Sequence, residues 1–372
     1  MNRIDPHDYG RMFKVDQRLI KTALELHYDA LVVDQHSDIQ MDIVTRRGRA
    51  EKKVIERLHL PKLTQGGIDF VLMSTTPHYG YQPHPFFMNP TLSALQLIDC
   101  GYSDVSESPD RLVLVTTPAE ILQAKQAGRT SFMLGIEGAE AVGTDLGLLR
   151  NFHRLGVRII TLTWHHRNMV ADGSGEPSGS GLSGFGREMV REMNRLGMIV
   201  DLSHIGQAGF WDALEVGQGP TIASHSNARA LCDHPRNLYD DQLRALAQKG
   251  GLVGVCFCSP YVREKGATVE HVLDHIDHLA ALIGVEHIAL GPDWVDFAVR
   301  MVMDNVDPES YLAKGTSITT FASGLENAAQ LPNLTIGLMA RGYKEKEIRR
   351  ILGLNFLEFL EKDLEPSGPA EK

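Results

Sequence analysis

Two short stretches decide the fold of this chain: MIVDLSH at residues 198–204 and PTIASHS at residues 220–226. Each is an apolar run rich in branched residues that reaches a histidine, His204 or His225, before small polar residues follow. Such a run is typical of a buried parallel strand whose last residue points into a site above the sheet. Because imidazole is the commonest side-chain metal ligand, two consecutive strands of this kind predict a metal site at one edge of a sheet.

Apolar runs of this kind occur eight times along the 372 residues and alternate with helical patterns. This alternation predicts an α/β fold, a TIM-type (β/α)8 barrel that occupies residues 1–372 as a single domain. We expect an N-terminal helix within about residues 1–29 and an excursion of weak periodicity at about residues 297–333. The eight runs are residues 30–33, 70–74, 131–136, 157–163, 198–204, 220–226, 252–257 and 286–291.

Composition excludes several kinds of partner. The net charge of −10 disfavours nucleic acid and anionic membranes, since both require a basic face. No run approaches the roughly 18 apolar residues of a membrane span, and residues 1–21 lack the apolar core of a secretion signal. Four cysteines do not make a disulfide framework in a chain of this length, so a cytoplasmic location is expected. We interpret Cys256 and Cys258, two apart in the seventh run, as small buried side chains.

Five of the eight runs end in residues capable of metal binding or acid–base chemistry. Active sites of such barrels lie at the C-terminal ends of the strands, so the shared position predicts a site more strongly than any single residue does. Taken alone, the first pair is also compatible with a turn whose aspartate caps the next helix, although a chelating pair is the favoured interpretation. The residues are His36 with Asp38 on the first run, Glu137 on the third, His204 on the fifth, His225 on the sixth and Asp293 on the eighth.

This set of side chains favours hydrolysis. Three histidines and two carboxylates without a thiolate suit Zn²⁺ and tolerate Mn²⁺, Co²⁺ or Fe²⁺. Glu137 could bridge two ions, which would lower the pKa of a shared water toward about 7 and make hydroxide attack on an amide or ester feasible. Asp293, expected opposite the first strand in a closed barrel, is placed to move a proton to the leaving group. A nucleophilic serine has little support, because Gly-x-Ser-x-Gly occurs only in broken form at residues 179–183.

Taken together, five motifs resemble those of the membrane (renal-type) dipeptidases, peptidase family M19, which is a metallopeptidase branch of the amidohydrolase superfamily. The resemblance extends from about residue 31 to about residue 360, nearly the whole chain. The motifs are DQHSD at residues 34–38, GIEG at 135–138, DLSH at 201–204, SHS at 224–226 and LGPDW at 290–294.

The resemblance implies a barrel of the amidohydrolase kind that binds two zinc ions, with Glu137 bridging them and Asp293 as the acid–base residue. Arg236, which follows His225 in the chain, matches the family's arginine that pairs with the terminal carboxylate of the substrate, a task suited to a guanidinium. A homodimer is also implied. In this scheme one ion is bound by His36 and Asp38, and the other by His204 and His225.

The fourth run departs from the family pattern. Members often carry a histidine directly after Leu-Thr, where it contacts the substrate and steadies the oxyanion, but Trp164 occupies that position here. His165 comes next, and on a strand its side chain would face the opposite way unless the chain bulges. Trp164 and His165 are therefore the candidates for setting the substrate range. Cys258 is a second departure, since some members place a tyrosine there.

These observations lead to three hypotheses. The first is a binuclear zinc dipeptidase that uses a metal-bound hydroxide and tolerates a D-residue on the carboxyl side of the bond. The second is a related amidohydrolase acting on another amide, a lactone or a cyclic dipeptide, which Trp164 favours. The third, a non-catalytic metal-binding barrel, is disfavoured because the set of candidate ligands and Asp293 is intact. Arg236 discriminates between the first two, since only a linear dipeptide offers it a free carboxylate.

Overall fold

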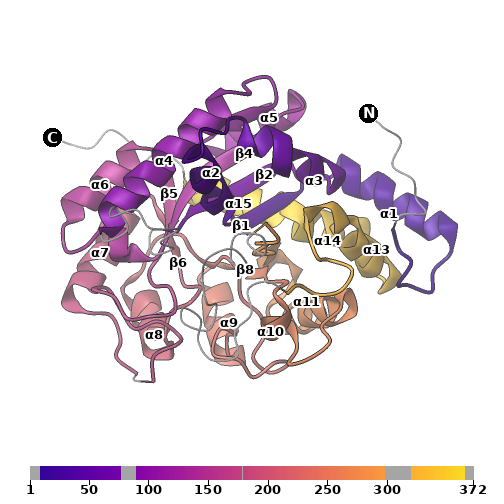
Figure 1. Cartoon of the computed structure of the whole chain (residues 1–372). Coiled ribbons are helices and arrows are strands. Elements are labelled where there is room, and N and C mark those ends of the chain that lie inside the picture. The colour runs from indigo at the N-terminus through magenta and orange to yellow at the C-terminus, as the bar shows by residue number, and fades with distance from the viewer. Residues whose placement is uncertain (1–8, 77–88, 178, 298–319, 365–372) are drawn as a thin grey trace.

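The computed structural model describes residues 9–76, 89–177, 179–297 and 320–364. Eight of its strands run parallel in the order in which they occur along the chain, and the first and last of them contact each other, so the sheet forms a nearly closed barrel (Figure 1). The predicted TIM-type α/β barrel is thereby confirmed. The eight strands are β1 (Val33–Ser37), β2 (Phe70–Thr75), β4 (Thr130–Glu137), β5 (Val157–Thr161), β6 (Ile199–Asp201), β7 (Thr221–Ala223), β8 (Leu252–Val255) and β9 (Ile288–Leu290).

One further strand, β3 (Leu112–Leu114), lies off this path and was not predicted. It pairs in parallel with the first residues of β4, from Thr130 to Phe132, whereas β5 pairs with β4 only from Leu134 onward. A strand of three residues is too short to carry a periodic pattern that could be read from the sequence.

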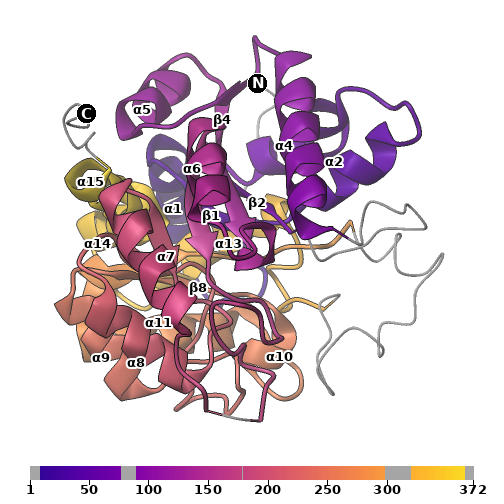
Figure 2. The ribbon, with the colours of Figure 1, turned by 90° about the vertical axis from the view of Figure 1, so that its left-hand side faces the viewer.

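Helices surround the sheet on its outer side, as the two perpendicular views show (Figures 1 and 2). Helix α8, between β6 and β7, was not predicted from the sequence. The α-helices are α1 (Gln17–Asp29), α2 (Ile39–Arg47), α3 (Leu60–Gln65), α4 (Pro90–Ser106), α5 (Pro118–Gln126), α6 (Leu146–Arg154), α7 (Gly184–Arg195), α8 (Gln207–Val216), α9 (Asp240–Gln248), α10 (Ser259–Val262), α11 (Val269–Ile283), α13 (Pro332–Ala340), α14 (Glu345–Arg349) and α15 (Asn355–Asp363).

The barrel interior is packed with apolar side chains. One buried cluster contains at least one residue from every barrel strand together with Phe356 and Leu360 of α15. Such a core fills a barrel of eight strands and leaves its C-terminal end for the polar side chains. Gly254 in β8 and Gly291 after β9 both lie against the carbonyl oxygen of Ser224, which follows β7. A Cβ at these two positions would lie only 1.9 and 1.8 Å from that oxygen, so only glycine allows this close approach.

The predicted N-terminal helix corresponds to α1, and residues 1–8 lie outside the described part of the chain. Residues 298–319 of the predicted excursion also lie outside it. The described end of the excursion pairs with the segment between β8 and α11, since Phe321 forms an isolated bridge with Cys258 and Ser323 forms one with Thr268. Within the described ranges, none of the helices is long and apolar enough to cross a membrane.

Candidate active site

The C-terminal end of the barrel brings together four predicted residues from four different strands. His36 lies in β1, Glu137 ends β4, and His204 and His225 follow the ends of β6 and β7. Glu137 Oε1 lies 3.5 Å from His36 Nε2, 3.0 Å from His204 Nε2 and 3.4 Å from His225 Nε2. One carboxylate oxygen thus stands among three imidazole nitrogens, and all four side chains are buried.

Two aspartates complete the cluster on the side of β1. His36 Nε2 lies 3.8 Å from Asp38 Oδ1 and 3.9 Å from Asp293 Oδ1. Thr76, just after β2, donates a hydrogen bond of 2.8 Å to Asp38 Oδ1. Asp38 does precede α2, but among the described residues its side chain accepts no hydrogen bond from the first turn of that helix. A role as the N-terminal cap of α2 therefore does not account for the position of the Asp38 side chain.

The position of Asp293 differs from the prediction in one respect. It was expected opposite the first strand, but β9 contacts β1 at the seam of the barrel, so Asp293 is a neighbour of His36. Asp293 has φ 61° and His204 has φ 65°, a left-handed conformation that is uncommon for residues other than glycine. Such a conformation costs about 1–3 kcal/mol and persists where the surroundings hold it, often at functional sites. Here it occurs in the turns that carry both side chains into the cluster.

The electrostatics of the cluster fit a bound cation. Burial raises the pKa of Glu137 well above its usual range and raises the pKa of Asp38 and of Asp293 to about 6. Among the described residues, neither His36 Nε2 nor Glu137 Oε2 has a hydrogen-bond partner. Buried carboxylates without partners are costly unless a positive charge lies beside them. A metal ion would supply that charge.

The histidines fit a metal for a complementary reason. Burial lowers the pKa of His36, and it lowers those of His204 and His225 well below the usual range. All three imidazoles are therefore neutral at neutral pH, which is the form that binds metal ions. Among the described residues, three groups of three ligand atoms in the cluster are close enough to share an ion: Glu137 with His204 and His225, His36 with Asp38 and Asp293, and His36 with Asp201 and His225.

A buried network that the sequence analysis missed sets the orientation of His225. Ser224 Oγ donates a hydrogen bond of 2.6 Å to Asp201 Oδ2 and lies 2.8 Å from His225 Nδ1. Since a hydroxyl has one proton, Ser224 accepts from His225, whose Nδ1 must carry its hydrogen. The lone pair of His225 is then on Nε2, which faces Glu137. The only signal in the sequence was the position of Asp201 at the end of an apolar run.

The structure places His165 beside the cluster. Strand β5 ends at Thr161, so the alternation of side chains along a strand, on which His165 would face the other way, does not extend to residues 164 and 165. Its ring centroid is 4.7 Å from that of His204 in an edge-on arrangement, while the ring of Trp164 is 4.4 Å from His165. Gly173 passes close to this segment, since a Cβ there would lie 2.3 Å from the carbonyl oxygen of Trp164.

Arg236 lies beside the histidines. Its side chain is buried, its Nη2 donates a hydrogen bond of 2.9 Å to the carbonyl oxygen of His225, and its guanidinium carbon lies 5.4 Å from the ring centroid of Tyr261. Arg236 Nε has no hydrogen-bond partner among the described residues. Arg236 and His204 both line a cavity of about 210 Å³. A donor is thus available beside the cluster for a negatively charged group.

A buried cluster of histidines and carboxylates at the C-terminal end of a parallel barrel defines a metal-dependent hydrolase. The sequence model described as "Membrane dipeptidase (Peptidase family M19)" matches residues 20–312. The chain therefore belongs to this family, and it is a metal-dependent dipeptidase, a hydrolase acting on peptide bonds.

Curated relatives and solved structures agree with this assignment. The chain is 32% identical to dipeptidase verJ of Clonostachys rogersoniana, over 95% of this chain and 89% of the relative. It is 31% identical to an uncharacterized dipeptidase of Schizosaccharomyces pombe, over 91% of this chain and 82% of the relative. An amidohydrolase structure from Pseudomonas aeruginosa is similar at 27% identity and a TM-score of 0.77, covering 92% of this chain and 98% of that one.

A second solved structure is relevant to the substrate. The metallopeptidase from Rhodobacter sphaeroides, solved with a phosphinate mimic of the dipeptide L-Ala-D-Ala, is similar at 27% identity and a TM-score of 0.76. The match covers 90% of this chain and 99% of that one.

Proposed function

We propose that this chain is a binuclear zinc dipeptidase. In this proposal His36 and Asp38 hold one ion, and Glu137 bridges to the second. The second ion is held by His204 and His225. The observation that supports it most directly is the place of Glu137 Oε1, between 3.0 and 3.5 Å from the Nε2 atoms of all three histidines. Nitrogen and carboxylate donors without a thiolate favour zinc and accept manganese, cobalt or iron.

Three residues around the cluster have further roles in the proposed reaction. When bound, zinc ions activate a water molecule and polarise the scissile carbonyl. Asp293, whose Oδ1 faces His36, takes up a proton and delivers it to the departing amine. Arg236 binds the free carboxylate of the dipeptide and so orients it in the cavity. His165, edge-on to His204, donates a hydrogen bond to the oxygen on which negative charge develops.

We further propose that the residue on the carboxyl side can have D-configuration. The support is the likeness to the Rhodobacter sphaeroides metallopeptidase, which was solved with a mimic of L-Ala-D-Ala. A second candidate function is hydrolysis of another amide, a lactone or a cyclic dipeptide. It is favoured by Trp164, whose buried indole packs against His165 next to the cluster.

The test is hydrolysis of a panel of L,L-, L,D- and cyclic dipeptides by protein stripped of metal and then reloaded with zinc, with the bound metal counted in parallel. We expect two zinc ions per chain and turnover of linear dipeptides that disappears on chelation. Glu137→Gln should abolish both the second ion and the turnover. Glu140→Gln, a partly buried carboxylate outside the cluster, is the matched control. Two bound ions without turnover of any linear dipeptide would overturn the dipeptidase proposal in favour of the second candidate.

A further inference from the structure

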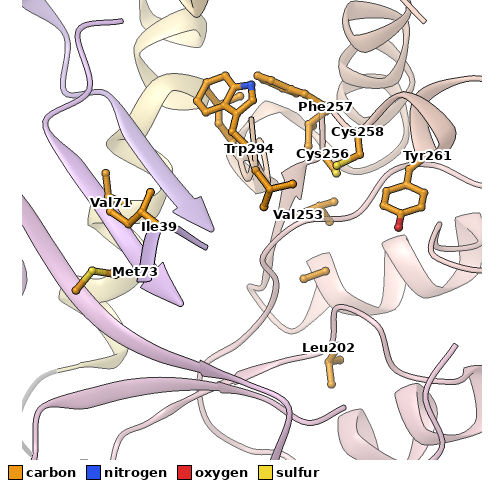
Figure 3. Packing of buried hydrophobic residues seen from close by; sticks show 14 of the residues in the cluster. Ile39, Val71, Met73, Leu202, Val253, Cys256, Phe257, Cys258, Tyr261 and Trp294 are labelled. Carbon is orange, nitrogen blue, oxygen red and sulfur yellow. The ribbon is translucent and has the colours of Figure 1, made fainter. Parts of the chain in front are cut away.

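Two cysteines lie directly behind Asp293. Cys256 and Cys258 follow β8, and both side chains are buried (Figure 3). Cys258 Sγ lies 3.4 Å and Cys256 Sγ lies 3.8 Å from the same oxygen, Asp293 Oδ2. One ligand atom from each of the three residues lies within 4.8 Å of the others. The sequence interpretation as small buried side chains is correct about burial, but both thiols also donate a hydrogen bond to the Asp293 carboxylate.

The geometry suits a metal ion. In a tetrahedral site with metal–sulfur bonds of about 2.3 Å and metal–oxygen bonds of about 2.0–2.2 Å, neighbouring ligand atoms stand roughly 3.5–3.8 Å apart. The two sulfur–oxygen distances, 3.4 and 3.8 Å, are within 0.1 Å of this range. Two sulfur ligands select soft cations, whereas the neighbouring cluster offers only imidazoles and carboxylates. The two sites therefore differ in the class of cation that they prefer.

Asp293 connects the two sites. Its Oδ2 faces the sulfur atoms, and its Oδ1 lies 3.9 Å from His36 Nε2 in the histidine cluster. The Asp293 side chain retains 14% exposure, whereas Cys256 and Cys258 have 0% and 1%, so the carboxylate is the most exposed member of this group. A cation held on Oδ2 would fix the carboxylate that the proposed mechanism uses to move a proton.

We propose that Cys256, Cys258 and Asp293 form a separate site for a thiophilic divalent cation such as Cd²⁺, and that its occupation inhibits hydrolysis by engaging Asp293. On binding, the two thiols lose their protons to solvent and form two metal–sulfur bonds, and no oxidant or reductant is required. The inhibition rests on the proposed function, whereas the cation site does not.

The test is a titration of zinc-loaded protein with Cd²⁺ under a non-thiol reductant. The ultraviolet thiolate-to-cadmium charge-transfer absorption reports only sulfur ligands, so exchange of cadmium into the histidine cluster does not contribute. We expect this absorption to saturate at one equivalent in the unmodified protein. Cys256→Ser and Cys258→Ser should lose it, because serine keeps a donor for Asp293 but is a poor ligand for a soft ion. Cys100→Ser and Cys232→Ser are the controls and should retain it.

Inhibition is measured against each variant's own activity without cadmium. We expect the inhibitory concentration of Cd²⁺ to rise at least 10-fold in Cys258→Ser. Absence of the absorption in the unmodified protein, or its loss in the control variants, would overturn the site. If Cys258→Ser fails to fold, retention by both control variants still locates the absorption at the remaining two of the four cysteines. Equal inhibition of all variants would overturn the proposal that the bound cation inhibits hydrolysis through Asp293. The absorption can be measured even if the chain has no dipeptidase activity, so the cation site is tested independently of the proposed function.

Discussion

Ser224 decides which nitrogen of His225 is available to a cation. Its hydroxyl proton goes to Asp201, which also accepts hydrogen bonds from the backbone nitrogens of Ser203 and Ser224 and from the Thr161 hydroxyl. Asp201 is thus fully engaged, and Ser224 has only its lone pairs to offer to His225 Nδ1. Partners of this kind behind a metal ligand set its tautomer and ring orientation.

Ser224→Ala should therefore weaken metal binding while leaving every proposed ligand in place. We expect a loss of roughly 10- to 100-fold in zinc affinity, measured by competition with a chromophoric chelator. Ser226→Ala is the matched control, because the buried Ser226 hydroxyl has no hydrogen-bond partner in the described ranges. Equal losses in the two variants would show that the effect does not depend on the hydrogen bond to His225.

Arg236→Ala should act on substrate binding. The variant loses the guanidinium that pairs with a free carboxylate, so we expect KM for linear dipeptides to rise by about 10- to 100-fold. The same dipeptides with an amidated C-terminus serve as the control and should show little change. Zinc content is checked in parallel, because Arg236 also donates to the carbonyl oxygen of His225. A similar rise in KM for both substrate sets would contradict a role in recognising the carboxylate.

At the scale of elements, His27 joins α1 to two other helices. Its Nε2 lies 2.8 Å from the carbonyl oxygen of Gly66 after α3, and its Nδ1 lies 2.7 Å from Thr335 Oγ1 in α13. A carbonyl oxygen only accepts, so Nε2 carries the hydrogen and Nδ1 accepts from the hydroxyl. Burial lowers the pKa of His27 to about 4, and the neutral ring is therefore the form that joins these helices.

This arrangement predicts acid sensitivity with a defined sign. Because the folded pKa of about 4 is below the unfolded value of about 6.5, the stabilisation is complete above pH 6.5 and declines as the pH falls toward 4. His27→Gln keeps a donor and an acceptor but does not titrate. The difference in unfolding free energy between the two proteins should shrink by about 2 kcal/mol from pH 7 to pH 5, as measured by urea unfolding of metal-free protein. A difference independent of pH would contradict the prediction.

The elements also show what the sequence could and could not predict. Glu137 and His225 were predictable because each follows a buried apolar run, and a parallel barrel sends all such strand ends to one side. The side to which His165 points could not be decided from the sequence, because nothing in it marks the end of β5 at Thr161. The role of Ser224 depends on where a single proton lies. The contact of Cys258 with Asp293 depends on the pairing of β8 with β9, which places the two following turns side by side.

At the scale of the whole molecule, the cluster brings negatively charged side chains from distant parts of the chain close together. Asp34, Asp38, Glu137 and Asp293 are all buried or nearly so at one end of the barrel, and burial raises the pKa of each of them. In metal-free protein at neutral pH these carboxylates must repel one another or take up protons. A bound cation favours the folded state by binding to it alone, by about 4 kcal/mol at a concentration 1,000 times Kd.

Removal of metal should therefore lower Tm by several degrees, and added zinc should restore it. The increase in Tm on adding zinc should also depend on pH. Burial lowers the pKa of the three proposed ligand histidines and raises that of Asp38 to about 6, so as the pH falls we expect protons to compete with the metal mainly at the carboxylates. We expect the increase in Tm on adding zinc to be largest above pH 7 and to decline below pH 6, as followed by scanning calorimetry. His36→Gln should reduce the increase at every pH, since the neutral amide is a poor zinc ligand. An increase of the same size at pH 5 and pH 8 would mean that zinc stabilises the protein elsewhere.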